Sequence, residues 1–572
     1  MKKILLVALN AKYIHSNPAV YCLKTYAVSY QDQIEIAEYT INQQTDDILR
    51  DIYRRKPDVI AFSCYIWNIT MVVELVESLA QIMPEIPLFL GGPEVSYDAQ
   101  TMLKKYPALT GIFIGQGETS FQKMVAYYID GIGNLNQIDG LVCQGQETVW
   151  IDEEDDALED FVAFSDYPFL YGDIESGNPL PTEFENRILY YESSRGCPFA
   201  CSYCLSSLDK RVRFRNVEKV KQELQFFLDN KVKQVKFIDR TFNVRRSHAK
   251  AIWQFLKEQD NGITSFHFEI GADLLKEEEL ELLSSLRIGQ IQLEIGVQTT
   301  NPDTLIAIRR KTDLERLKQN VICLQKNRNI KLHLDLIAGL PYEDLESFRR
   351  SFNEVYAWQP DELQLGFLKV LKGSAMYDKK EEYGLCYKTA PPYEVLSTNW
   401  LSYADVSLLK GVEEVLEMYY NSRQFVHSLR FLHHFFPNAF AFYEALATYY
   451  EKQGYQVSSL NRLQRYEILE KFSKEYLTME QQNVLQELLI YDLYLREKIK
   501  SRPYFAKEMI EQKEVKKEKG KRMHIEAFSY DRALAEQTGE CVEKPHKVKF
   551  DYEERNPVTM ECKIELYDFL SD

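Results

Sequence analysis

The sequence predicts an α/β protein with three regions: a parallel, doubly wound sheet, a central partial (β/α)6 barrel, and a mostly helical domain that ends in a β-hairpin. Short apolar runs alternate with helical patterns up to Leu371, as in chains of repeated strand–helix units. Beyond Ser374 the pattern changes to aromatic-rich helical segments with few glycines. A length of 572 residues also exceeds one core, because domains usually hold roughly 100 to 200 residues. We therefore predict domains at 1–150, 186–373 and 374–572, with a linker at 151–185.

The amino-terminal region contains apolar runs that are strand candidates. They are KKILLVAL, QIEIAEY, DVIAFS, PLFLGG and GIFIGQ. The segments between them are long enough for crossover helices, at residues 19–30, 46–55, 71–83 and 121–128. Repeated units of this kind predict a Rossmann-like (flavodoxin-like) parallel sheet that binds ligands at the carboxyl ends of its strands. An acidic stretch at residues 152–160 then marks the linker.

The central region contains longer strand–helix units whose strands have one polar face. The strand candidates are RILYYES, QVKFID, SFHFEI, GQIQLEIGV, KLHLDLIAG and ELQLGFLK. On three of them, alternate positions are polar or glycine: His267, Glu269, Gln292, Glu294, Gly296, Gln298, His333 and Asp335. A parallel sheet covered by helices on both faces would be apolar on both. The pattern therefore predicts a partial barrel with a wet interior that binds a ligand.

Charge and hydropathy exclude several classes of protein. Lys plus Arg total 69 and Asp plus Glu total 86, and this net charge of −17 disfavours nucleic-acid binding and a polybasic membrane anchor. No run approaches about 18 apolar residues, so we predict no membrane-spanning helix. The apolar run at 4–9 is too short for a signal peptide, and we expect a cytoplasmic protein. A charged run at 513–522 is typical of a solvated helix end or linker.

Three cysteines form the strongest chemical pattern in the sequence. Cys197, Cys201 and Cys204 have a C-x3-C-x2-C spacing, directly after the first strand of the central region. Three thiolates from one short loop can bind three corners of an iron–sulfur cluster and leave one iron open. A zinc site would need a fourth ligand, and the next histidine, His248, is 44 residues beyond Cys204. Zinc and inert core cysteines remain the alternatives.

The loop R-G-C-P-F-A-C-S-Y-C after a barrel strand resembles that of the radical SAM superfamily. The resemblance implies that the three cysteines hold a 4Fe-4S cluster. It also implies that S-adenosylmethionine binds the open iron and is cleaved by one electron to methionine and a 5'-deoxyadenosyl radical. A one-electron reductant such as flavodoxin or ferredoxin is the implied partner.

The resemblance also implies a set of residues that contact S-adenosylmethionine. Where the family has a Gly-Gly-Glu-like segment, this chain has F-I-D-R-T-F-N, so Asp239 becomes the expected acceptor for the ammonium group, with Arg240 or Asn243 as helpers. A helix cap or turn is the alternative role for Asp239. The full expected set is Tyr203, Asp239, Glu269, Glu294, Gly296, Gln298, Gly339 and Pro341. Acid–base or substrate roles are open to His267, His333 and Asp335, as is a purely structural one.

The amino-terminal region resembles the cobalamin-binding domain that precedes the barrel in one radical SAM subgroup. The motifs that carry this resemblance are F-S-C-Y, L-G-G-P-E and G-Q-G-E, which follow successive strands. The implied cobalamin contacts are Asn10, Ser63, Tyr65, Gly91, Gly92, Gly115 and Glu118. The Asp-x-His-x-x-Gly motif is absent, because Tyr13 and Pro18 replace its Asp and Gly around His15. We therefore expect cobalamin with its own base displaced and no protein histidine on cobalt.

Together these resemblances imply a cobalamin-dependent radical SAM enzyme. The expected reaction is methyl transfer to an unactivated carbon, with S-adenosylmethionine used once to supply the methyl group and once to make the radical. Radical rearrangement or cyclisation without methyl transfer is one alternative, and a non-catalytic corrinoid or S-adenosylmethionine sensor is another. The substrate, a small molecule or a peptide, is not identified by the sequence. The region at 374–572 resembles an uncharacterised extension found in one branch of the family.

Overall fold

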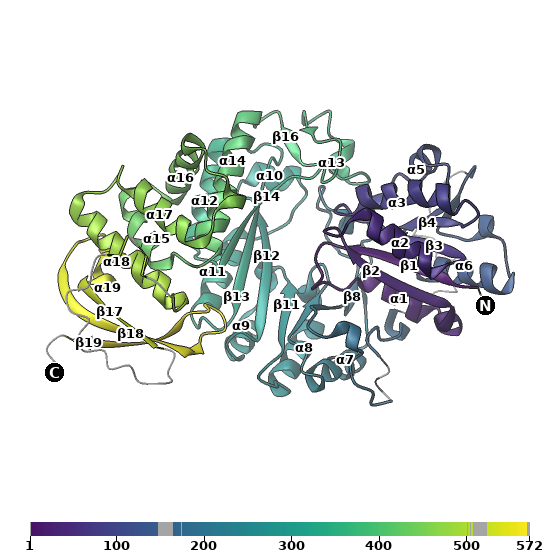
Figure 1. Cartoon of the computed structure of the whole chain (residues 1–572), viewed down its shortest axis with the longest axis horizontal. Helices are drawn as coiled ribbons and strands as arrows, with labels where there is room; N and C mark the ends of the chain where they lie inside the picture. The colour runs from purple at the N-terminus through teal and green to yellow at the C-terminus, as the bar shows by residue number, and fades with distance from the viewer. Residues whose placement is uncertain are drawn as a thin grey trace. The chain divides into compact units, whose positions relative to one another are not determined.

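The computed structural model describes residues 2–146, 164–172, 174, 176–499, 502–503, 505–506 and 523–568 (Figure 1). The acidic stretch at 152–160 and the charged run at 513–522 lie outside the described residues. The chain divides into two compact units, which are described separately. The first holds Met1–Gln292, Leu305–Thr312 and Leu368–Leu396, and the second holds Leu293–Thr304, Asp313–Phe367 and Ser397–Asp572.

The amino-terminal sheet belongs to the first unit. Its strands are β1 (Ile4–Asn10), β2 (Ile34–Thr40), β3 (Val59–Ser63), β4 (Leu88–Gly91), β5 (Leu109–Phe113) and β6 (Leu141–Cys143). They lie in the order β2-β1-β3-β4-β5-β6, and β1 to β5 are parallel. The predicted flavodoxin-like sheet is therefore confirmed. Strand β6 adds an antiparallel edge beside β5.

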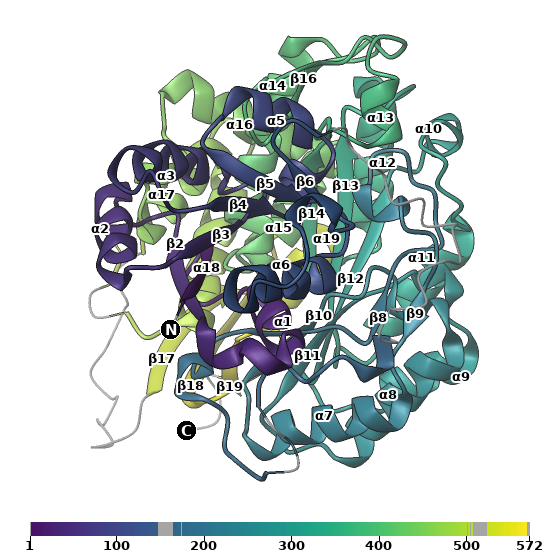
Figure 2. The ribbon, with the colours of Figure 1, turned by 90° about the vertical axis from the view of Figure 1, so that its right-hand side faces the viewer.

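Helices cover both faces of this sheet. They are α1 (Pro18–Tyr26), α2 (Thr45–Arg55), α3 (Ile69–Ile82), α4 (Pro93–Ser96), α5 (Ala99–Lys105) and α6 (Glu118–Asp130). Side chains such as Val7 pack in one core with α2, α3 and α5, and the alternate side chains, such as Leu6, pack in another with α1 and α6. Figure 2 shows α2 and α3 on one side of β3 and β4, and α1 and α6 on the other. Ligands can therefore reach this sheet only at the ends of its strands.

The central sheet contains the predicted strands in chain order. They are β7 (Leu189–Tyr191), β10 (Gln234–Phe237), β11 (Ser265–Glu269), β12 (Ile291–Gln298), β13 (Lys331–Ala338) and β14 (Glu362–Phe367), in the order β14-β13-β12-β11-β10-β7. The helices after them include α7 (Val217–Asp229), α8 (Arg246–Glu258), α9 (Glu277–Ser284), α10 (Pro302–Ala307), α11 (Leu314–Gln325) and α12 (Leu345–Ala357). In β12 and β13, fully buried residues alternate with half-buried ones, which confirms one apolar and one polar face.

The carboxy-terminal region, in the second unit, is mostly helical. Its longer helices are α14 (Tyr403–Leu416), α16 (Ala439–Gln453), α17 (Arg462–Ser473) and α18 (Met479–Arg496), with shorter α15 (Val426–Leu432) and α19 (Arg532–Thr538). The predicted hairpin is present as β18 (Glu543–Arg555) and β19 (Cys562–Asp568), and β17 (Met523–Tyr530) extends it to three antiparallel strands. Among the helices of the described residues, none is long and apolar enough to span a bilayer.

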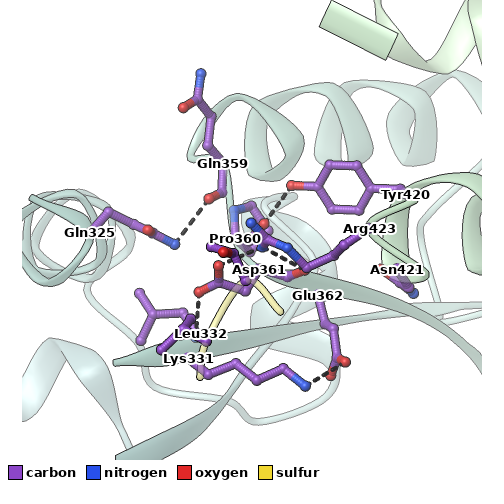
Figure 3. A network of polar contacts seen from close by, with 12 residues as sticks. Gln325, Lys331, Leu332, Gln359, Pro360, Asp361, Glu362, Tyr420, Asn421 and Arg423 are labelled. Atoms are coloured by element: carbon purple, nitrogen blue, oxygen red, sulfur yellow. Dashed lines mark hydrogen bonds and ion pairs between the residues drawn. The ribbon is translucent and has the colours of Figure 1, made fainter. Parts of the chain in front are cut away.

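A short π-helix (Glu417–Asn421) attaches this helical region to β14, the last strand of the central sheet. The side-chain amide of Asn421 donates to the Leu363 carbonyl at 3.0 Å and accepts from the Leu363 amide at 2.9 Å. It thereby forms the two hydrogen bonds that a neighbouring strand would form. Arg423 pairs with buried Asp361 at 2.5 Å, close to the same strand (Figure 3).

Candidate functional site

The cysteine loop of the first unit is held by backbone hydrogen bonds from three separate segments. The Cys197 amide donates to the Asp209 carbonyl at 2.9 Å, within the connection between the short strands β8 (Ser194–Arg195) and β9 (Arg213–Phe214). The Ser202 amide donates to the Ile308 carbonyl at 2.9 Å, and the Ser202 carbonyl accepts from the Met376 amide at 2.8 Å. These hydrogen bonds fix the backbone of the loop at both Cys197 and Ser202.

Two further features fix the segment that carries the three cysteines. The Ser207 hydroxyl donates to the carbonyls of Cys201 and Cys204, at 3.0 and 2.6 Å. Gly196 has φ of 97°, and a Cβ there would lie 2.1 Å from the Arg211 carbonyl oxygen. Only glycine fits this position, so the residue before the first cysteine is fixed by the close approach of the returning strand.

The three thiols are free and suited to a cluster rather than to one ion. Cys197 and Cys201 are buried, whereas Cys204 is half-buried. Among the His, Cys, Asp and Glu residues of the described chain, one group has three possible metal-ligand atoms that all lie within 4.8 Å of one another. That group is Glu294, His333 and Asp335, and not the three cysteines. A tetrahedral zinc ion would bring its sulfur ligands to about 3.8 Å from one another. The wider spacing of these cysteines fits the corners of an iron–sulfur cubane better than a mononuclear zinc site.

A half-buried arginine lies beside this loop. The Nη1 atom of Arg310 is 3.9 Å from the Cys201 sulfur and 3.5 Å from the Tyr203 hydroxyl. The guanidinium thus donates a weak hydrogen bond to the sulfur. Sequence reasoning missed Arg310, because it follows Tyr203 by more than a hundred positions in the chain.

Asp239, the expected acceptor for an ammonium group, is fully buried after β10. Its carboxylate accepts from the hydroxyls of Ser193 and Ser194, at 2.7 and 2.6 Å, and from the Ser193 amide at 3.0 Å. Burial raises the pKa of Asp239 to about 6, against the lowering effect of these donors. In this conformation Asp239 braces the segment leading to the cysteines, so its contact with an ammonium group remains a prediction.

The predicted cobalamin residues lie at the carboxyl ends of β1, β3, β4 and β5, the ligand edge of a parallel sheet. Ser63 ends β3, and its hydroxyl accepts a hydrogen bond from the side-chain amide of Asn17 at 3.1 Å. Asn17 is 4% exposed, and its Oδ1 has no hydrogen-bond partner among the described residues. A buried acceptor without a donor fits a bound ligand that donates a hydrogen bond. Sequence reasoning missed Asn17, although it immediately precedes α1.

Backbone geometry at this edge supports a close approach. Gly92 has φ of 113°, and a Cβ there would lie 2.5 Å from the Cys64 carbonyl oxygen. Nearby, the ring of Tyr65 stacks on that of Trp67, with centroids 4.4 Å apart, and Trp67 is 46% exposed. Gly115, with φ of 67°, turns the chain after β5. This edge of the sheet therefore has closely packed backbone segments beside an exposed aromatic side chain.

Glu118 pairs with the arginine of the cysteine motif. Its carboxylate accepts from Arg195 at 2.7 Å, and Arg195 also binds Glu192 through two nitrogens, at 2.9 and 2.7 Å. Although burial alone would raise it, the pKa of Glu118 lies below its ordinary value because of Arg195. This ion pair links the predicted cobalamin domain directly to the cysteine loop. A cobalamin contact by Glu118 remains a prediction.

The loop after β1 uses its polar side chains for internal contacts. Asn10 donates to the His15 carbonyl at 3.0 Å and to Glu38 at 2.9 Å. The Tyr190 hydroxyl lies 2.7 Å from Nδ1 of His15. These hydrogen bonds, all within the protein, use the side-chain amide nitrogen of Asn10 and Nδ1 of His15.

The second unit brings together three of the predicted polar residues, Glu294 on β12 with His333 and Asp335 on β13. Nε2 of His333 is 2.8 Å from Oδ1 of Asp335, and Nδ1 of His333 is 3.9 Å from Oε2 of Glu362. Burial lowers the pKa of His333, but Asp335, Glu294 and Glu362 raise it above its ordinary value overall. The group is an anionic cluster around one imidazole.

The remaining predicted residues mark the strand ends. Gln298 ends β12 with φ of 74°, and its Oε1 is buried without a hydrogen-bond partner in the described residues. This strained residue with an unused acceptor fits a ligand contact. Gly339, with φ of 89°, precedes Pro341 in the turn after β13. In the first unit, His267 is 6% exposed on β11 and Glu269 ends that strand.

Comparison with protein families follows the same order along the chain. Residues 4–125 match the family described as a B12 binding domain, and residues 191–355 match the radical SAM superfamily. The chain combines a B12-binding domain with a radical SAM domain. The two family resemblances inferred from the sequence motifs are therefore confirmed. Residues 381–556 match a family described as a protein of unknown function, DUF4080.

Relatives of this B12-binding radical SAM protein include enzymes with different reactions. It is 24% identical to the cobalamin-dependent radical SAM methyltransferase TokK of Streptomyces tokunonensis, over 66% of this chain and 57% of that one. It is 23% identical to the anaerobic magnesium-protoporphyrin IX monomethyl ester cyclase of Rubrivivax gelatinosus, over 59% of this chain and 60% of that one. The chain thus spans little more than half the length of these relatives.

A solved structure shares the fold of this radical SAM protein across most of the chain. The cobalamin-dependent S-adenosylmethionine radical enzyme OxsB, with aqua-cobalamin and S-adenosylmethionine bound, superposes with a TM-score of 0.55. The match covers 86% of this chain and 80% of that chain at 12% identity. The likeness supports the predicted fold, in which one parallel sheet is followed along the chain by a second.

Proposed function

We propose that the protein is a cobalamin-dependent radical SAM enzyme that transfers a methyl group to an unactivated carbon. The observation that carries this proposal is the cysteine loop, held ready by three backbone anchors and joined through Arg195 and Glu118 to the B12-binding domain. The methyltransferase TokK among the relatives supports the methyl-transfer reaction. A non-catalytic sensor is disfavoured, because a pure binder needs no open iron.

Cys197, Cys201 and Cys204 would hold the 4Fe-4S cluster, with the Arg310 guanidinium 3.9 Å from the sulfur of Cys201. When bound, the cluster would supply the electron that cleaves S-adenosylmethionine, and cobalamin would supply the methyl group. Gln298 would offer its buried Oε1 to S-adenosylmethionine. Asp239 fixes the segment before the cysteines through Ser193 and Ser194.

Asn17, Ser63 and Gly92 would contact cobalamin at the strand ends of the amino-terminal sheet. Gly92 allows the chain after β4 to pack closely against the Cys64 backbone, and Asn17 offers a buried acceptor. The Tyr190 hydroxyl engages Nδ1 of His15 and leaves its Nε2 available, so the absence of a protein histidine on cobalt stays a prediction.

The test is S-adenosylmethionine cleavage by the anaerobically reconstituted protein. With a reductant such as dithionite or flavodoxin, the wild type should bind iron and form 5'-deoxyadenosine. Cys201→Ala should lose both the cluster absorbance and the product, whereas Cys386→Ala, which changes an exposed cysteine, should keep both. Retained cleavage in Cys201→Ala would contradict the cluster assignment.

Cobalamin binding is measured separately, by absorption. The bound cofactor should show the base-off spectrum, and Asn17→Leu should weaken binding by about tenfold, as expected for the loss of about 1.4 kcal/mol. Thermal unfolding of the variant without cobalamin controls for misfolding. A base-on spectrum, or equal affinity in the variant, would overturn this part of the proposal.

Radical cyclisation is the second candidate, favoured by the similarity to the cyclase of Rubrivivax gelatinosus. S-adenosylmethionine with a deuterated methyl group separates the two reactions once a substrate is known. Deuterium in the product supports methyl transfer, and a product without it supports cyclisation or rearrangement.

A further inference from the structure

We propose that Glu294, His333 and Asp335 bind a single divalent transition-metal ion of the Mn²⁺, Fe²⁺ or Zn²⁺ class. The three residues lie on the polar faces of β12 and β13, and one donor atom from each lies within 4.8 Å of the others. The site uses none of the cysteines. It is additional to the proposed cluster and does not depend on it.

The spacing of the donor atoms is that of ligands around one ion. Nε2 of His333 and Oδ1 of Asp335 are 2.8 Å apart. Around an octahedral ion with bonds of about 2.1 Å, neighbouring ligands are about 3.0 Å apart and opposite ligands about 4.2 Å. The observed spacing therefore needs only small side-chain movements to close around a metal.

A carboxylate behind the imidazole completes the arrangement. Oε2 of Glu362 lies 3.9 Å from Nδ1 of His333, on the partner position of the adjacent strand β14. Lys331 donates to the other oxygen of Glu362 at 2.6 Å and so fixes its orientation (Figure 3). Metal-bound histidines usually direct their second nitrogen at such a carboxylate, which fixes the tautomer and strengthens the ligand. Nε2 is thus left facing Oδ1 of Asp335.

The partial burial of these carboxylates favours the binding of a cation. His333 and Asp335 are 14% and 19% exposed, and Glu362 is 28% exposed. Carboxylates held together away from bulk water repel one another. A divalent ion bound between them would reduce this repulsion. One imidazole with two carboxylates suits Mn²⁺, Fe²⁺ or Zn²⁺ and leaves positions open for water or an anionic substrate group.

A second histidine–carboxylate contact in the same unit provides a matched control. Nε2 of His524 lies 3.0 Å from Glu526, but Arg502 also binds both oxygens of Glu526, at 2.7 and 2.8 Å. The guanidinium already neutralises this carboxylate, so His524 should not contribute to metal binding.

The experiment titrates Mn²⁺ into the full-length, cluster-reconstituted protein under anaerobic conditions and follows free Mn²⁺ by electron paramagnetic resonance. The wild type should bind one ion per chain, and Zn²⁺ should displace it. His333→Gln and Asp335→Asn should each weaken binding by at least about tenfold, and Glu362→Gln should do so by about tenfold through the imidazole. His524→Gln should bind as the wild type does.

Iron content and circular dichroism of each variant report whether the rest of the protein is intact. Cys201→Ala should lose iron but keep the Mn²⁺ site, so this proposal and the proposed function fail separately. Absence of Mn²⁺ and Zn²⁺ binding to the wild type at millimolar concentration would overturn the proposal. Unchanged affinity in both His333→Gln and Asp335→Asn would also overturn it.

Discussion

The amino-terminal and central sheets are both parallel, yet their strands are buried in different ways. Every residue of β1 and β3 is buried, whereas buried and half-buried residues alternate along β12 and β13. Helices on both faces confine chemistry to the strand ends of the first sheet. The polar face of the second can carry functional groups along the strands, as the cluster around His333 shows. The same strand–helix repeat thus produces two kinds of site, and the side-chain pattern distinguishes them.

The largest expected effect is a charge placed inside the amino-terminal sheet. Val7 is 0% exposed in β1, so Val7→Asp would bury an unpaired carboxylate and destabilise the first unit by more than about 4 kcal/mol. Gln234→Asp, on a half-buried position of β10, should cost less than about 1 kcal/mol. Urea unfolding followed by circular dichroism measures both. Equal losses would show that the two sheets do not differ as described.

A pH-dependent effect should arise after β13, where Glu343 is fully buried. Burial raises the pKa of Glu343 to about 7, although Thr299 and Ser351 donate to it at 2.6 and 3.0 Å. The folded state therefore holds this proton more tightly than the unfolded state. The stability that it contributes is complete below about pH 4.5 and is lost as the pH rises through 7.

Comparison with Glu343→Gln isolates this contribution. The wild-type free energy of unfolding minus that of the variant should fall by about 3 kcal/mol between pH 4.5 and pH 8. Glu346→Gln, which changes a carboxylate that is 66% exposed, should give a nearly constant difference. Urea unfolding at several pH values provides the measurement. Parallel profiles for wild type and Glu343→Gln would contradict the predicted ionisation.

The smallest expected effect is at the edge of the central sheet. Asn421→Ala removes two hydrogen bonds to Leu363 and should cost about 1 to 2 kcal/mol. Asn421→Asp keeps the acceptor for the Leu363 amide, so its loss should be smaller. Hydrogen exchange at the Leu363 amide is the direct measurement. Unchanged protection in Asn421→Ala would show that the side chain does not replace a strand.

The sequence predicted most of the fold and the cysteine loop because both depend on local patterns. Alternation along β12 and β13 revealed a polar face, and the spacing of three cysteines indicated a cluster. Strand β17 was missed, since it lacks a turn signal joining it to β18 in the sequence. It pairs with β18 only after α19 has reversed the chain.

Contacts between distant segments could not be predicted in this way. Arg195 stands within the recognised motif, but its partner Glu118 lies 77 positions earlier. Arg310 and Asn17 gain significance only from what folding places beside them. Sequence motifs identified the predicted cofactor residues, whereas the residues that hold them in place were found only in the structure.

The amide of Asn421 has a consequence for how this chain can be divided. A shortened protein ending at residue 373 would keep all central strands but leave the Leu363 amide and carbonyl of β14 without these partners. Exposed strand edges recruit other strands, so such a fragment should self-associate more than the full chain does. Attempts to express the radical SAM sheet alone should therefore retain the helical segment through Arg423.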